Sequence, residues 1–162
     1  METIRFRHAH FSARLPVTFR YAPSHFWMAP ADGSPAAADR AGAWRVGFTK
    51  FATRMLGELV EMVIDVPSGA ALRGGDRLGT VEGFKAVSEL YAVMDGTLLG
   101  ANPGLTAEAC LTHSDPYGAG WLYAVEGVPT AGSLDVHAYI ALLSETIDRL
   151  QSSRYSGGGD GP

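Results

Sequence analysis

The chain contains two lysines, Lys50 and Lys85, because arginine supplies the rest of its 13 basic residues. Lys85 stands between two alternating segments, residues 77–82 and 87–94, which are typical of the strands of a β-hairpin. A solvated lysine has a pKa of about 10.4, so its protonated amine is a weak nucleophile. We therefore expect Lys85 to lie at or beside the hairpin tip. There it either keeps a turn soluble or presents its amine to another protein's active site.

Familiar catalytic patterns are incomplete elsewhere in the chain. Residues 74–79 have spaced glycines but lack the Gly-Lys-Ser/Thr that completes a P-loop. Cys110 and His113 are three residues apart, which favours two residues flanking a turn over a catalytic pair. His8 and His10 have no further ligand nearby in the sequence, so we predict no metal site.

Composition narrows the class of protein. The 162 residues suit one domain with tails, and 46% hydrophobic residues are enough for a core. A net charge of −4 gives no reason to expect a nucleic-acid partner, and no apolar run approaches the ~20 residues of a membrane span. The single Cys110 favours a reducing compartment, and residues 1–8 lack the apolar core of a secretory signal. We expect a cytoplasmic protein, or a mitochondrial matrix protein in a eukaryote, without a membrane partner.

The ends of the chain differ from its centre. Residues 1–20 are rich in arginine and are predicted to be a basic N-terminal arm, either lying on the domain or partly disordered. Ser133 is predicted to cap a C-terminal helix over residues 134–150, which packs on the domain through a stripe of apolar residues. The stripe comprises Val136, Ile140, Leu143, Ile147 and Leu150. Residues 151–162 have little to bury and are predicted to be a flexible tail.

The central residues 21–150 are predicted to form a mainly β domain with short helices. Residues 56–83 and 95–127 repeat faintly, each as a strand, a Pro/Gly-rich connection and a second strand, which favours a flattened fold with pseudo-twofold symmetry. Thr49 is predicted to cap a short helix, Lys50–Leu56, that Gly57 ends. Residues 29–42, rich in Ala, Pro, Gly and Asp, are predicted to be a loop.

Several motifs occur in the order known from one family. Residues 82–89, Glu-Gly-Phe-Lys-Ala-Val-Ser-Glu, resemble a segment in which Glu-Ser-Val-Lys-Ala is typical. Residues 24–27 resemble a His-Glu-Trp motif, and residues 46–52 resemble Val-Gly-Ile-Thr-Xaa-Tyr-Ala. Residues 115–121 resemble Asp-Pro-Tyr-Gly-Xaa-Gly-Trp. The family is the glycine cleavage system H protein, and the resemblance covers about residues 21–150.

The resemblance implies a lipoyl-type barrel-sandwich hybrid of two quasi-repeated β units, in which residues 29–42 are an insertion. It implies that Lys85 carries lipoate as an amide. Glu82 and Gly96 take the positions at which modifying enzymes select that lysine, and His25 lies near the resting lipoyl arm. The sequence departs from the family at Gly83 and Phe84, where Ser-Val is common, and at Phe26, where Glu is usual.

The implied function is that of a non-catalytic carrier. Glycine decarboxylase (P protein) would load an aminomethyl group, aminomethyltransferase (T protein) would remove it, and dihydrolipoamide dehydrogenase (L protein) would take up electrons. A lipoate-attaching enzyme would be the fourth partner. Two alternatives stay open at this point: a lipoate-binding carrier of a sulfur-oxidation pathway, to which H-like proteins are also similar, and an H-like interaction module that is never lipoylated.

Overall fold

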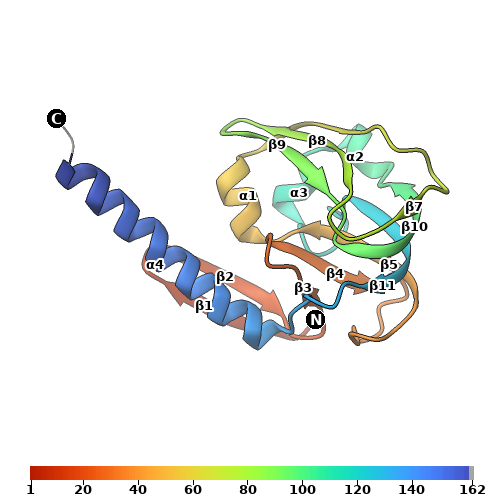
Figure 1. Cartoon of the computed structure of the whole chain (residues 1–162), viewed down its shortest axis with the longest axis horizontal. Helices are drawn as coiled ribbons and strands as arrows, with labels where there is room; N and C mark the ends of the chain where they lie inside the picture. Colours follow the sequence, from red (N-terminus) through yellow and green to blue (C-terminus); the bar gives the residue numbers. More distant parts are fainter. Residues whose placement is uncertain (161–162) are drawn as a thin grey trace.

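A computed structural model describes the backbone of residues 1–160 and the side chains of residues 1–153. Short antiparallel strands dominate this part of the chain, and the longest helix is at its C-terminal end (Figure 1). In chain order the elements are β1 (Thr3–His8), β2 (Phe11–Pro16), β3 (Arg20–Tyr21), β4 (Phe26–Pro30), β5 (Gly42–Phe48), α1 (Lys50–Leu56), β6 (Leu59–Ile64), β7 (Ala71–Leu72), β8 (Arg77–Gly83), β9 (Val87–Tyr91), β10 (Met94–Ala101), α2 (Gly104–Ala107), α3 (Leu111–Ser114), β11 (Tyr123–Pro129) and α4 (Val136–Asp160).

Two antiparallel sheets form the central domain. One has six strands in the order β3-β4-β5-β11-β10-β7, and the other has three in the order β6-β8-β9. The two predicted repeats correspond to the antiparallel pairs β6–β8 and β10–β11, which belong to different sheets. The sheets do not close into a barrel, and the predicted barrel-sandwich hybrid is confirmed.

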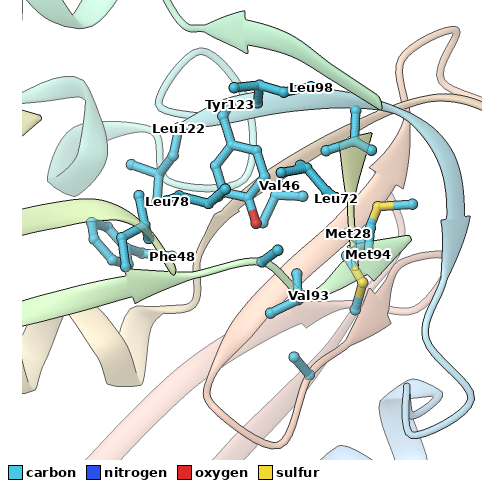
Figure 2. Packing of buried hydrophobic residues seen from close by; sticks show 14 of the residues in the cluster. Met28, Val46, Phe48, Leu72, Leu78, Val93, Met94, Leu98, Leu122 and Tyr123 are labelled. Carbon is cyan, nitrogen blue, oxygen red and sulfur yellow. The ribbon is translucent and has the colours of Figure 1, made fainter. Parts of the chain in front are cut away.

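The space between the sheets is filled by one hydrophobic core. Alternation along β5 turns Trp44, Val46 and Phe48 inward, and all three are buried. They belong to one cluster with side chains from the neighbouring elements, and Figure 2 shows Val46 and Phe48 of this cluster together with Leu78 of β8 and Leu98 of β10. This packing holds β8 and β9, and therefore the turn that joins them, against the larger sheet.

Residues 1–20 were predicted to be a basic arm, and this prediction was wrong. Residues 3–16 instead form the hairpin β1–β2. Its strands pair in register from Thr3↔Pro16 to His8↔Phe11. The arginines alternate with apolar residues, so one face of the hairpin is basic and the other is buried. The buried face joins a second core with α1, β4 and α4. The members of this core are Phe6, Phe11, Ala13, Leu15, Tyr21, Trp27, Ala29, Phe51, Val136, Tyr139, Leu143 and Ile147.

The C-terminal helix differs from the prediction at both ends. Leu134 pairs with Tyr21 through two backbone hydrogen bonds, so the chain is still extended there and Asp135 caps the helix in place of Ser133. The predicted stripe packs through Val136, Leu143 and Ile147, whereas Ile140 is only partly buried and Leu150 is exposed.

The predicted flexible tail is also corrected in part. The backbone of residues 151–160 continues α4, while residues 161–162 lie outside the described part of the chain. No described side-chain contact explains this continuation. Neither α4 nor another helix within residues 1–160 combines the length and the apolar character that a membrane crossing requires.

The predicted loop at 29–42 is shorter in the structure. β4 extends to Pro30 and β5 begins at Gly42, so residues 31–41 connect two paired neighbouring strands. An ion pair between Asp32 and Arg40 closes the loop, at 2.8 Å between the carboxylate and guanidinium atoms. The Ala36 amide donates to the Thr18 carbonyl, which ties the loop to the chain before β3.

The second core makes a direct prediction about stability. Leu143→Ala removes a side chain that is 1% exposed, and we expect a loss of about 2–5 kcal/mol in the free energy of unfolding. Leu150→Ala makes the same change on the same helix at a side chain that is 45% exposed, and should cost no more than about 0.5 kcal/mol. Urea denaturation measures both. Equal effects would mean that α4 does not pack as described.

Candidate functional site

Lys85 lies in the turn between β8 and β9, as predicted. We call residues 83–86 the Lys85 turn. The turn is closed by the Gly83 amide, which donates to the Ala86 carbonyl at 2.9 Å. The Lys85 side chain is exposed, its Nζ donates to the Arg54 carbonyl at 3.1 Å, and the ion pairs found among residues 1–153 do not involve it. An exposed amine on a short, hydrogen-bonded turn is accessible to a modifying enzyme.

The turn is fixed to the C-terminal end of α1. The Lys85 amide donates to the Leu56 carbonyl at 2.9 Å, and the Phe84 amide donates to the Glu58 carbonyl at 3.0 Å. Gly57 ends α1 with a positive φ of 81°, which glycine adopts without a Cβ penalty. These bonds satisfy backbone groups that a helix end otherwise leaves free, so α1 and the turn stabilise each other.

The predicted limits of α1 are confirmed, and one residue links the helix to the motif around His25. Thr49 Oγ1 accepts from the Ala52 amide at 3.3 Å as the N-cap, and it donates to the His25 carbonyl at 2.9 Å. Two of the family-like motifs, at 24–27 and 46–52, therefore meet at the start of the helix.

The structure gives a reason for the glycine at position 83, where serine is common in the family. A Cβ at this position would lie 2.3 Å from the Leu56 carbonyl oxygen and 2.6 Å from the Leu56 Cγ. Neither atom can move without disturbing α1 or the core, because Leu56 is buried. A glycine thus allows β8 to pass closely over the end of α1, and in this chain the common serine would not fit.

An apolar cavity of about 480 Å³ lies beside the Lys85 turn. Its walls come from α1, from the strands β4 and β5, and from the β8–β9 hairpin. They are mostly hydrophobic and include His25, Phe51, Met55, Ala86 and Val87. Phe84 and Val87, on either side of the lysine, are 76% and 72% exposed. The cavity and these side chains form an apolar surface around Lys85.

His25 is held in a partly buried hydrogen-bond network. The Tyr139 hydroxyl donates to Thr49 Oγ1 at 3.2 Å, which leaves the Tyr139 oxygen to accept from His25 Nδ1 at 2.8 Å. This pattern assigns the proton to Nδ1 and leaves Nε2 as an acceptor. Burial lowers the pKa of His25 to about 4, so the ring is neutral at physiological pH. Tyr139 was not predicted as a site residue, because the predicted apolar stripe contains its neighbour Ile140 instead.

The other two predicted site residues lie in different places. Glu82 is exposed at the end of β8, opposite Val87, and is therefore close to the Lys85 turn. Gly96 is in β10, opposite Gly127 of β11, and a Cβ there would lie 2.1 Å from the Glu126 carbonyl oxygen. Figure 1 shows β10 on the other side of the domain from the β8–β9 tip. The structure thus brings Glu82 to Lys85 but gives Gly96 a packing role.

The motif at 115–121 supports the site without entering the cavity. Asp115 Oδ2 accepts from the Ala119 amide at 2.9 Å and fixes a compact loop. From this loop the Pro116 carbonyl accepts from Trp27 Nε1, and the Tyr117 hydroxyl accepts from the Lys50 amide. Within the described residues, no group of three or more His, Cys, Asp or Glu side chains is arranged to hold a metal ion.

Comparisons with known proteins all point to one family. The family model for Glycine cleavage H-protein matches residues 27–137. A glycine cleavage system H protein from Beutenbergia cavernae is 39% identical over 132 residues, covering 80% of this chain and 97% of the relative. One from Mycobacterium avium is 36% identical over 140 residues, covering 81% and 98%. The crystal structure of a glycine cleavage system H protein from Mycobacterium marinum matches with a TM-score of 0.68 at 33% identity, covering 78% and 97%.

An exposed lysine on a fixed turn beside an apolar cavity is typical of a domain that carries a covalently attached group. This chain belongs to the glycine cleavage H-protein family and has a lipoyl-carrier role in the glycine cleavage system. The hairpin β1–β2 and most of α4 flank the residues that match the family.

The close contact at Gly83 predicts that a single methyl group destabilises the site. Gly83→Ala places a Cβ against the Leu56 carbonyl, and we expect a loss of about 1–3 kcal/mol. Gly132→Ala is the matched control, because nothing lies within 4 Å of a Cβ there, and its effect should stay within about 0.5 kcal/mol. Urea denaturation of both variants would contradict the described packing if Gly83→Ala were as stable as the control.

The buried His25 predicts a dependence of stability on pH. Its pKa is about 4 in the folded protein and about 6.5 when unfolded, so below pH 6.5 the unfolded chain binds the extra proton. Stability should therefore fall as the pH falls from about 6.5 towards 4. His25→Asn removes the titrating ring and tolerates the φ of 73° at this position. Melting temperatures between about pH 7 and pH 4.5 should fall more for the wild type, and parallel curves would refute this account.

Proposed function

We propose that Lys85 is the lipoyl-attachment residue and that this chain is the carrier component to which the enzymes of glycine cleavage come in turn. The observation that supports this best is the position of Lys85, which is exposed on a turn held by the end of α1. Lys50, the other lysine, starts α1, and its backbone is bound to Tyr117.

The residues around Lys85 suit the cofactor. Lipoate, bound as an amide, supplies a dithiolane whose sulfurs accept a one-carbon unit and electrons. The protein holds and delivers this group while the chemistry belongs to the cofactor. Amide formation replaces the charged amine with a neutral group, so the hydrogen bond from Nζ to the Arg54 carbonyl loses its ionic character. An apolar arm then has an apolar cavity at hand, which favours its return to the protein between transfers.

We propose His25 as the polar contact within that cavity. Its Nε2 is free to accept a hydrogen bond, while Nδ1 is occupied by Tyr139. Phe26, in place of the usual Glu, adds an aromatic wall in place of a charge. A neutral acceptor among hydrophobic side chains suits an arm that must be held loosely and released.

The proposed partners follow from the carrier role. They are glycine decarboxylase, aminomethyltransferase, dihydrolipoamide dehydrogenase and a lipoate-attaching enzyme, and the proposed compartment is the cytoplasm. Glu82 beside the turn is proposed to help the attaching enzyme to select Lys85. A tethered arm raises the effective concentration of the transferred group at each partner, which is the advantage of a carrier over a diffusing cofactor.

A substitution that keeps the charge tests this proposal. Lys85→Arg cannot form the lipoyl amide, and its exposed side chain buries little, so we expect unchanged thermal stability and complete loss of glycine decarboxylation and exchange in a reconstituted assay. Lys50→Arg is the control and should keep full activity. Activity of Lys85→Arg comparable with that of the wild type would refute the carrier role of this residue.

A further inference from the structure

A second pocket lies at the other end of α1 from the Lys85 turn. It has a volume of about 590 Å³ and is formed by β1 and β2, by the first turn of α1 and by the chain around α3. We call it the basic pocket, because Arg5, Arg14 and Lys50 line it and no acidic residue does. Its volume is in the range of small-molecule sites.

Within residues 1–153, the three cations are among the basic side chains that have no ion-pair partner. Arg40 and Arg77 form ion pairs with carboxylates. Within residues 1–153, neither an ion pair nor a side-chain hydrogen bond is found for Arg5, Arg14 or the Lys50 ammonium. Their charges are therefore available to a ligand.

The hairpin also places two of these charges together. Arg5 and Arg14 are direct cross-strand partners, so their side chains leave the same face of a two-stranded sheet. Like charges in this relation repel each other and destabilise the pair. Two guanidinium groups side by side can instead bind phosphate or carboxylate oxygens in a bidentate manner, which offsets the repulsion.

A neutral donor completes the pocket. Tyr117 lines it, and its hydroxyl accepts from the Lys50 amide at 3.0 Å, but within residues 1–153 no acceptor is found for the hydroxyl's own proton. Burial raises the pKa of Tyr117 to about 12, so the hydroxyl remains a donor at neutral pH. Ser12 and His113 add further polar groups to the wall.

We propose that the basic pocket binds a small ligand with two or more phosphate or carboxylate groups. The site goes beyond the carrier function, because Arg5 and Arg14 lie outside residues 27–137, the range that the family model matches. The basic pocket is also separate from the Lys85 turn. Lys50 and Lys85 mark opposite ends of a seven-residue helix, about 10 Å long, so a ligand here leaves the Lys85 turn free.

The test is a binding titration of the full-length, unlipoylated protein with pyrophosphate and, separately, with citrate. Binding would be measured during the titration by calorimetry or by changes in amide chemical shifts. We expect saturable binding of at least one anion, and tighter binding of pyrophosphate or of citrate tells whether the ligand carries phosphate or carboxylate groups. Arg14→Gln and Lys50→Gln should each weaken binding by about tenfold, since each removes a charge-assisted hydrogen bond.

Arg7→Gln is the matched control. Arg7 is exposed on the same hairpin as Arg14 but does not line the pocket, and its removal changes the net charge by the same amount. Binding should then change less than about twofold. Equal weakening by Arg7→Gln and Arg14→Gln would overturn the proposal in favour of diffuse attraction to a basic surface. Absence of saturable binding up to about 10 mM of both anions would also overturn it.

Discussion

The hydrogen bond from the Lys85 amide to the Leu56 carbonyl is the contact on which the site depends. It joins the turn that carries the lysine to the last residue of α1, and the pair Phe84–Glu58 repeats the connection beside it. A hairpin tip alone would be mobile, because its side chains are exposed and its neighbours are few. Here the backbone of the tip is fixed, while the lysine side chain is exposed and has a single hydrogen bond, to the Arg54 carbonyl. This combination suits the proposed attachment at Lys85, because the lysine is presented in one place while its side chain remains exposed.

The helix that provides this anchor is itself held by both cores. Leu56 belongs to the core between the two sheets, and Phe51 belongs to the core that α4 and the hairpin β1–β2 complete. At its start, Thr49 is bonded to His25 and Tyr139. The N-terminal hairpin and α4 are therefore not appendages. They pack against α1 through Phe51, and the hairpin also forms one wall of the basic pocket at the other end of the helix.

Sequence analysis predicted the elements that local chemistry determines. Thr49, Lys50–Leu56 and Gly57 contain the cap, the helix and the stop of α1 within a few residues, and alternation around Lys85 sufficed for the β8–β9 hairpin. Predictions that depended on distant partners were wrong. Ser133 was expected to cap α4, but Leu134 pairs with Tyr21, more than a hundred residues earlier, and this moves the start of the helix. The hairpin β1–β2 was missed although Phe6, Phe11, Ala13 and Leu15 alternate with polar residues, because its arginines dominated the composition. The glycine at position 83 could not be predicted from the sequence, because it is required by the close contact with the Leu56 carbonyl of a different element.

The central claim is that Lys85, and not Lys50, carries the lipoyl group. Its most direct test is mass spectrometry of peptides from the protein purified after expression with a competent lipoate-attaching enzyme. The account predicts one lipoyl or octanoyl adduct, on Lys85, because this amine is exposed on the anchored turn next to Glu82. An adduct on Lys50, or an unmodified Lys85 under these conditions, would contradict it.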